Sequence, residues 1–201
     1  MRSAAALALC VVLAACSLGG PTAPAIPVAG TTSTPQQAAS AARITPPPVA
    51  PPAPPGTNVP AFKCADSAGG SAGIGNVTQA RVGAQAGYDR LVLQFDTKVP
   101  AYTVKRQAKP TFKNGASGAS LTLSGTAGVL VQVHSATMAS SYSGTTDFTH
   151  PEFVVLNEAR LIEDFEGYVL WGLGLSRPAC MRTFTLSDPP RLVVDFASGS
   201  R

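Results

Sequence analysis

The chain has 201 residues, of which 45% are hydrophobic and 13% are charged, and its formal net charge is +4 at pH 7. That length allows one domain with its own hydrophobic core. The 4 cysteines include no pair at C-x-x-C spacing and there are only 2 histidines, which argues against the recognised kinds of zinc site. We therefore expect neither a metal nor another cofactor.

The N-terminal residues have the pattern of a bacterial export signal. Arg2 is followed by an apolar run from Ala4 to Leu13, which is too short for a membrane span of about 20 residues. The run ends in Leu-Ala-Ala before Cys16, which resembles the lipobox, where the cysteine receives a diacylglycerol and cleavage occurs just before it. We predict a signal peptide at 1–15 and an extracytoplasmic protein held by its lipidated Cys16 in a bacterial membrane, inner or outer if the cell has both. The alternative is an ordinary signal peptide.

Residues 16–61 are rich in proline and alanine. They contain most of the chain's 18 prolines, and Arg43 is the one charged residue among them. No hydrophobic period is present, so this segment has too little apolar surface to offset its chain entropy. We predict a disordered linker in which Pro46 to Pro55 favours an extended, semi-rigid spacer. Recognition of its prolines by a partner is the alternative.

Two cysteines remain after the signal and the lipid site are assigned, Cys64 and Cys180. Export places them in a compartment that permits oxidation, so the simplest expectation is a disulfide between them. Closing so long a loop stabilises a fold by about 4–5 kcal/mol in the chain-entropy model. Two free buried thiols or an intermolecular bridge are the alternatives.

Residues 62–198 show short alternating apolar runs separated by turn residues, with no long amphipathic helix. This pattern predicts an all-β domain, a small antiparallel β-sandwich of about eight or nine strands. The segment EARLIEDFE could instead end in a helical turn, and 67–75 and 136–149 are expected to be loops. The expected strands are 91–95, 102–106, 121–123, 129–133, 153–162, 169–175, 181–186 and 191–196.

Three motifs suggest a family. They are GYDRLVLQF at Gly87–Phe95, the Phe165-Glu166-Gly167 turn before an aromatic strand, and SDPPRLVVD at Ser187–Asp195. In this order they resemble the AMIN-like domain, over most of Val77 to Phe196. That domain is similar to the AMIN module of periplasmic amidases and secretins, a β-sandwich that localises its host by binding peptidoglycan. The resemblance implies a sandwich fold with a binding role.

Candidate catalytic groups are few. Gly69–Gly73 matches G-x-S-x-G, but that motif needs a preceding strand and a following helix, so we interpret it as a loop. Glu163, Asp164 and Glu166 are nearly adjacent in one turn, whereas glycosidase carboxylates face each other across a cleft. We interpret these three residues as a solvated acidic turn, and we expect no enzyme activity.

Other chemistry-bearing residues have structural interpretations. Asp147, His150 and Glu152 lack a recognised metal-ligand spacing, so we expect a solvated loop there. Trp171, the single tryptophan, lies in an apolar strand and is expected in the core. The alternative for Trp171 is a platform for sugar stacking.

Five residues are the candidate ligand-binding set: Tyr88, Arg90, Arg191, Lys105 and Arg106. Arginine forks bind carboxylates bidentately, so the first three could line a polar surface for glycan or peptide carboxylates. The competing interpretation is that the arginines form ion pairs with their neighbouring aspartates. The other two belong to a basic stretch between Lys98 and Lys113 that contains no acid. Such a stretch serves either to protect a sheet edge or to attract anionic wall polymers or lipid headgroups.

These features predict a non-catalytic envelope lipoprotein whose domain binds peptidoglycan or an anionic wall polymer. The alternatives are a subunit that docks an envelope enzyme or assembly through protein contacts, and a hydrolase. Nucleic acid is not an expected partner, because export separates the protein from it.

Overall fold

The computed structural model describes residues 59–199, so the predicted signal peptide, Cys16 and nearly all of the predicted linker lie outside the described residues. Within 59–199, no helix has the length and apolar character required to cross a bilayer. The described strands are β1 (Ser67–Gly69), β2 (Val77–Gln85), β3 (Tyr88–Phe95), β4 (Tyr102–Gln107), β5 (Thr111–Lys113), β6 (Ser120–Thr122), β7 (Ala127–His134), β8 (Asp147–Thr149), β9 (Leu156–Phe165), β10 (Tyr168–Leu175), β11 (Met181–Leu186) and β12 (Arg191–Ala197).

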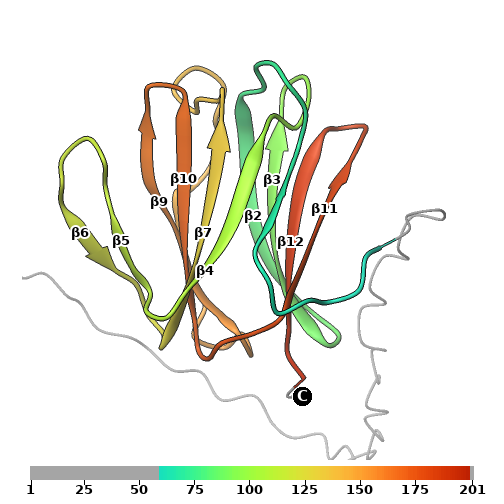
Figure 1. Ribbon diagram of the computed structural model, residues 1–201, viewed down its shortest axis with the longest axis vertical. Coiled ribbons are helices and arrows are strands. Elements are labelled where there is room, and N and C mark those ends of the chain that lie inside the picture. The colour runs from blue at the N-terminus through green and yellow to red at the C-terminus, as the bar shows by residue number, and fades with distance from the viewer. Residues whose placement is uncertain (1–58, 200–201) are drawn as a thin grey trace, which may run out of the picture. The chain divides into compact units, whose positions relative to one another are not determined.

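Two antiparallel sheets form the fold (Figure 1). One has six strands in the order β1-β4-β7-β10-β9-β8, and the other has four in the order β11-β12-β3-β2. Their inner faces share one hydrophobic cluster, to which β3 contributes Leu91, Leu93 and Phe95 and β10 contributes the fully buried Trp171. The predicted all-β sandwich is therefore confirmed, as is the core position of the tryptophan.

The structure has more strands than the eight or nine predicted, for local reasons. β2 was missed because a register shift between Val77 and Gln79 interrupts its alternation, and because small and polar residues dominate it. β1 and β8 lie in segments expected to be loops, and each has only three residues. In the segment EARLIEDFE, the strand prediction is correct and the helical alternative is wrong, since Glu158 to Phe165 belong to β9 and only Glu166 lies in the turn after it.

The hairpin β5–β6 covers part of the outer face of the six-stranded sheet. Phe112 of β5 packs with Leu123 and Ile162 in a second, smaller hydrophobic cluster. The Phe112 ring lies directly above Gly172 of β10, where an added Cβ would be 2.7 Å from the ring. At Gly174, an added Cβ would lie 2.1 Å from the carbonyl oxygen of Ser124. Glycines on this face thus allow the hairpin to approach the sheet.

Cys64 and Cys180 form a disulfide that spans 116 residues of sequence, as predicted. It joins the segment before β1 to the start of β11. A pair of backbone hydrogen bonds between Lys63 and Met181 lies beside it. The disulfide therefore fastens the N-terminal segment of the described chain to the four-stranded sheet.

Candidate functional site

Two of the family-like motifs meet on the outer face of the four-stranded sheet. Asp195 of β12 has a side chain with no exposed surface, and it accepts two hydrogen bonds from Arg90 of β3, at 2.6 and 3.0 Å. Arg182 of β11 donates a third, at 2.7 Å. The hydrogen bonds to Asp195 raise the pKa of Arg90 above its usual value. A buried carboxylate thus joins three neighbouring strands.

Aromatic rings enclose this cluster. The Arg90 guanidinium lies 5.1 Å from the centre of the Tyr88 ring, and the Arg182 guanidinium lies 4.4 Å from that of Phe62 and 4.7 Å from that of Tyr88. Guanidinium groups in such positions are attracted to ring faces. These three interactions restrain the arginine side chains that hold Asp195.

Asp89, the neighbour of Arg90, has a different function from the one expected. It is buried on the inner side of β3, and it accepts hydrogen bonds from the backbone amides of Val155 and Leu156, at 2.6 and 2.9 Å. Adjacent residues in a strand point to opposite faces, so Asp89 and Arg90 cannot pair with each other. The expected ion pair between them is wrong, and the true partner of Arg90 lies 105 residues along the chain.

The predicted ligand-binding residues do not form one surface. Tyr88 and Arg90 lie together, and Arg191 is on the same face of β12 as Asp195, about 13 Å further along the strand. Arg191 donates to the backbone carbonyl of Pro189, and no ion pair with Asp188 is present among the described residues. Lys105 and Arg106 belong to β4 in the other sheet. A ligand-binding role for this set remains a prediction.

The basic stretch is not a bare sheet edge either. β1 pairs with β4 and covers its edge up to Val104. Beyond that pairing, the backbone amide of Arg106 donates to Asp66, at 3.0 Å. Lys105 and Arg106 are consecutive in the strand, so their side chains leave opposite faces. β1 thus protects the edge of β4 only as far as Val104, and the edge-protection interpretation stays a prediction for Lys105 and Arg106.

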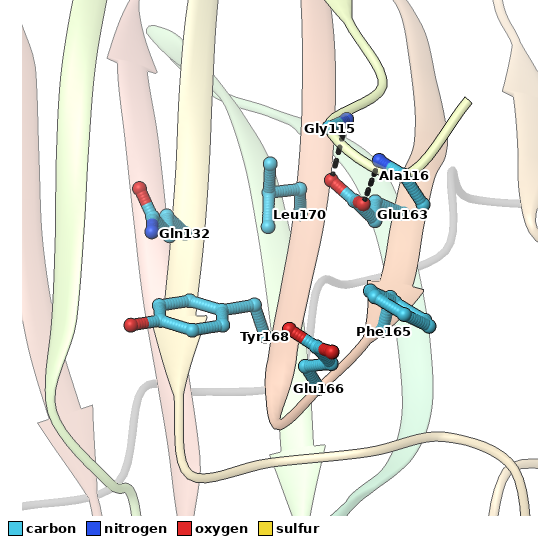
Figure 2. A pocket seen from close by; sticks show the side chains of 8 residues that line it. All are labelled: Gly115, Ala116, Gln132, Glu163, Phe165, Glu166, Tyr168 and Leu170. Carbon is cyan, nitrogen blue, oxygen red and sulfur yellow. Dashed lines mark hydrogen bonds between the residues drawn. The ribbon is translucent and has the colours of Figure 1, made fainter. Parts of the chain in front are cut away.

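A hollow on the outer face of the six-stranded sheet has the features of a binding site (Figure 2). It lies beside the β5–β6 hairpin and has a volume of about 310 Å³. We call it the aromatic shelf, and it is lined by Gly115, Ala116, Gln132, Glu163, Phe165, Glu166, Tyr168 and Leu170. Phe165 is 51% exposed and Tyr168 is 42% exposed, which is unusual for large apolar rings in a folded domain.

Local backbone geometry exposes the two rings together. Glu166 and Gly167 have positive φ angles of 48° and 79°, which gives the tight turn that joins β9 to β10. Tyr168 and Phe165 are therefore directly paired across the two strands, with both side chains on the outer face. The Tyr168 ring also packs edge-on against His134 of β7, at 4.9 Å between ring centres.

The acids of this segment have fixed partners. Both carboxylate oxygens of Glu163 accept hydrogen bonds, from the amides of Gly115 and Ala116 at 2.9 and 2.8 Å (Figure 2). Asp164 accepts one from the amide of Met138 at 2.9 Å. These two acids thus anchor loops, and the prediction of a solvated acidic turn applies only to Glu166. Because both carboxylate oxygens of Glu163 accept these hydrogen bonds, Glu163 is poorly placed to transfer protons to a substrate.

The other chemical motifs contribute no second site. Ser71 of the G-x-S-x-G match donates to the carbonyl of Val99 in a loop after β1, as expected. His150 bonds Glu152 at 2.8 Å, which lowers the pKa of Glu152, while Asp147 pairs with Arg160. In the part of the chain that the structure describes, no group of three or more His, Cys, Asp or Glu residues could hold a metal ion.

Sequence reasoning found the Phe165 turn as a family motif but not as a site. A signal was available: two aromatic residues flank a two-residue turn ending in glycine, and such residues face the same side of a hairpin. Which face of the hairpin is exposed depends on the strands that pack beside it, and the sequence does not show which strands these are. The same holds for Gly115 and Ala116, which reach the shelf only because the hairpin folds over the sheet.

Comparisons with known proteins agree with the motifs. A search of the curated proteins finds no match to the chain. The family model described as the AMIN-like domain matches residues 75–198, which include every strand from β2 to β12 and all three motifs. The setting of that domain is the cell envelope, outside the cytoplasm. Because the match covers more than half of the chain, this protein belongs to the AMIN-like domain family.

Proposed function

We propose that this protein is a non-catalytic envelope module that binds the glycan of peptidoglycan through the aromatic shelf. The observation that carries the proposal is the exposed pair Phe165 and Tyr168, set beside polar groups in a hollow. The apolar face of a sugar ring packs well on an aromatic ring. The amide of Gln132 and the carboxylate of Glu166 are placed to bond the hydroxyl and amide groups around such a ring.

The chemistry of the shelf favours binding over hydrolysis. Glycosidases need one carboxyl group free to give a proton and a second to act as base or nucleophile. Both oxygens of Glu163 are engaged by backbone amides. That leaves Glu166 as the carboxylate of the shelf that faces solvent, with no hydrogen-bond or ion-pair partner among residues 59–199. Rigid aromatic rings with fixed polar neighbours suit recognition of a polymer.

A sedimentation assay with purified cell wall tests this proposal. Residues Ala53–Arg201 form one compact unit that contains both sheets and the disulfide, so a fragment of that length suits the assay. We expect the fragment to enter the wall pellet and the double variant Phe165→Ala/Tyr168→Ala to bind about tenfold more weakly, or worse. Ile74→Ala is the matched control, since Ile74 is 69% exposed and lies outside the shelf.

The conditions of the assay separate the competing ligands. Stacking on a glycan persists at moderate salt, whereas attraction of anionic wall polymers to lysines and arginines weakens. Walls stripped of their anionic polymers should therefore still retain the fragment. If they do not, or if the double variant sediments like the unaltered fragment, the glycan proposal is wrong. Crosslinking in cells that recovers one envelope protein, without wall binding, would favour the docking alternative.

We also propose that Cys16 carries a lipid that holds the protein at a membrane. The support is the short apolar run that ends at this cysteine, together with the envelope setting of the family. Two or three acyl chains give stable anchoring, whereas a single chain is marginal. The proline-rich residues after Cys16 would then provide the reach from the membrane to the wall.

A further inference from the structure

A second hollow lies at the end of the sandwich, next to the disulfide, and shares no residue with the aromatic shelf. Its volume is about 640 Å³, within the range of small-molecule sites. A smaller hollow of about 200 Å³ adjoins it and shares Arg106, Pro178 and Ala179. We call the pair the disulfide groove. The larger part is lined by Ala61, Phe62, Cys64, Arg106, Arg177, Pro178, Ala179, Cys180, Ala197 and Gly199.

The walls of the groove are apolar except for two arginines and, in the smaller hollow, Gln107. Alanine, proline, phenylalanine and the disulfide supply the rest of the larger hollow, and no acidic residue lines it. The smaller hollow extends the apolar wall with Ala127, Val129 and Leu175. The aromatic shelf is the reverse, because its lining includes two glutamates and no cation. The two hollows therefore suit ligands of different charge.

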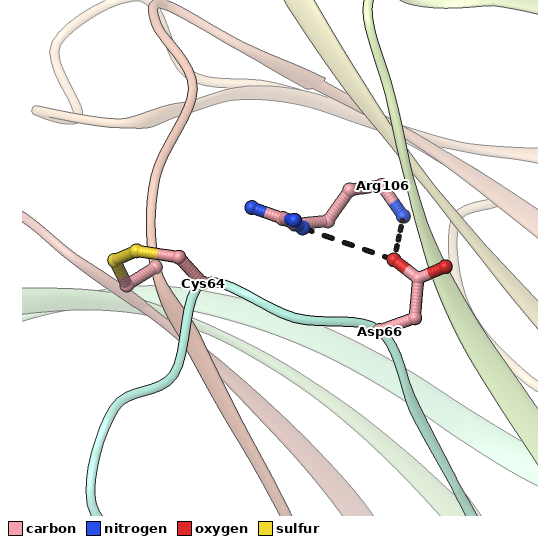
Figure 3. Close-up of a disulfide and its surroundings, with 4 residues drawn as sticks. Cys64, Asp66 and Arg106 are labelled. Carbon is pink, nitrogen blue, oxygen red and sulfur yellow. Dashed lines mark hydrogen bonds and ion pairs between the residues drawn. A yellow bond between two sulfur atoms is a disulfide. The ribbon is translucent and has the colours of Figure 1, made fainter.

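Arg106 is the cation available to a ligand. Its side chain extends from β4 toward the disulfide (Figure 3), and it is 41% exposed. Its Nε lies 3.8 Å from Asp66, and its two terminal nitrogens have no hydrogen-bond partner among residues 59–199. Arg177 is more restrained, since its terminal nitrogens donate to the carbonyls of Val154 and Ser198.

We propose that the disulfide groove binds an apolar chain that ends in a single anionic group, with the anion on Arg106. A guanidinium with free donors matches a carboxylate or phosphate, and the apolar walls favour an aliphatic body. A peptide fits less well, because the only polar side chains that its amides could meet are the two arginines and, in the smaller hollow, Gln107. Burying amides without partners is costly. This site goes beyond the proposed glycan binding, and its test does not depend on the wall.

The test uses the fragment Ala53–Arg201 and decanoate below its micellar concentration, with binding followed by amide chemical shifts and by calorimetry. We expect shifts at Cys64, Ala179 and Ala197. Decyltrimethylammonium, which has the same chain and the opposite charge, should bind at least about tenfold more weakly. Decyl phosphate should compete with decanoate for the same amides.

The matched variants are Arg106→Gln and Lys105→Gln. Each removes one positive charge from β4, but the two side chains leave opposite faces of the strand. We expect Arg106→Gln to weaken decanoate binding about tenfold, the effect of losing a charge-assisted hydrogen bond. Lys105→Gln should leave the affinity unchanged.

Several results would overturn the proposal. They are no binding of decanoate, equal binding of the ammonium compound, or equal effects of the two variants. Binding of tri-alanine as tightly as decanoate would reject the aliphatic assignment. The comparison of oppositely charged ligands needs no variant, so it decides the question even if Arg106→Gln folds poorly.

Discussion

Charged residues of the family motifs stabilise the fold by hydrogen bonds to residues that are far away in the sequence. Arg90 and Asp195 are 105 residues apart in sequence, and Asp89 holds the amides that begin β9. Both aspartates are almost fully buried. A buried carboxylate is tolerated only when it is paired or hydrogen-bonded, so each motif requires its distant partner. For Arg90 and Asp195 this dependence is between two side chains, whereas Asp89 depends on backbone amides alone.

The cluster around Asp195 gives a prediction at this scale. In Asp195→Asn, two arginines that are 27% and 17% exposed lose their counter-charge. Removing one partner of a buried pair leaves an uncompensated charge, so we expect a loss of about 3–5 kcal/mol in the free energy of unfolding. Urea denaturation measures it. Asp188→Asn makes the same chemical change at an exposed turn and should cost little; equal losses in the two variants would contradict the prediction.

At the scale of elements, the outer face of the six-stranded sheet is divided between packing and exposure. The β5–β6 hairpin covers the half that contains Gly172, and the β9–β10 turn exposes Phe165 and Tyr168 on the other half. A register shift in β9 places Ile162 and Glu163 on this face, the first under the hairpin and the second beside its loop. The hairpin therefore forms one wall of the aromatic shelf.

The approach of the hairpin depends on Gly172. In Gly172→Ala, the new methyl group would lie 2.7 Å from the Phe112 ring and 2.9 Å from Ile162. Overpacking of this kind costs about 1–3 kcal/mol. We expect a loss of that size in thermal or urea unfolding, with weaker wall binding because the hairpin moves away from the shelf.

Two further variants check that interpretation. Gly83→Ala is the matched control, since its new methyl group would meet only the end of Gln85, at 3.6 Å. Phe112→Leu, combined with Gly172→Ala, should recover part of the lost stability because it removes the ring from the contact. Additive losses in the double variant would show that the two residues do not interact.

At the scale of the whole molecule, the two proposed sites differ in position and charge. The aromatic shelf lies on an outer sheet face, and the disulfide groove lies at the end of the sandwich. The disulfide forms part of the groove wall and also closes a loop of 116 residues, a constraint that is worth about 4–5 kcal/mol in the chain-entropy model. One crosslink thus stabilises the domain and shapes a binding site.

The proposed anchor gives a prediction at the same scale. Expressed as the full chain, the protein should partition into the detergent phase of a Triton X-114 extraction, because its acyl chains are apolar. In Cys16→Ser, the mature protein should be lost from that phase. Cys10→Ser changes the other cysteine of the signal and should partition normally. If the Cys16 variant still enters the detergent phase as a mature protein, lipid attachment at that residue is excluded.

Much of the fold could be predicted from the sequence because alternation is a local signal. The pattern of β3 and of β10 is visible in residues such as Leu91, Leu93 and Trp171, and these form the core. β2 was not predicted because a bulge interrupts its alternation of apolar and polar residues. β1 and β8 were not predicted because three residues are too few to show such an alternation. The site was harder to predict, because Phe165 and Tyr168 look like core residues when considered alone.

By itself, the sequence determined the all-β class, the pairing of Cys64 with Cys180 as the simplest outcome, and the resemblance to one family. These follow from composition, spacing and short-range periodicity. Only the tertiary structure decided that Arg90 bonds Asp195 instead of Asp89, and that Arg106 lies beside the disulfide. It also decided which aromatic rings stay exposed. The physical reason is that pairing, burial and exposure depend on which strands become neighbours, and strands far apart in sequence become neighbours only when the chain folds.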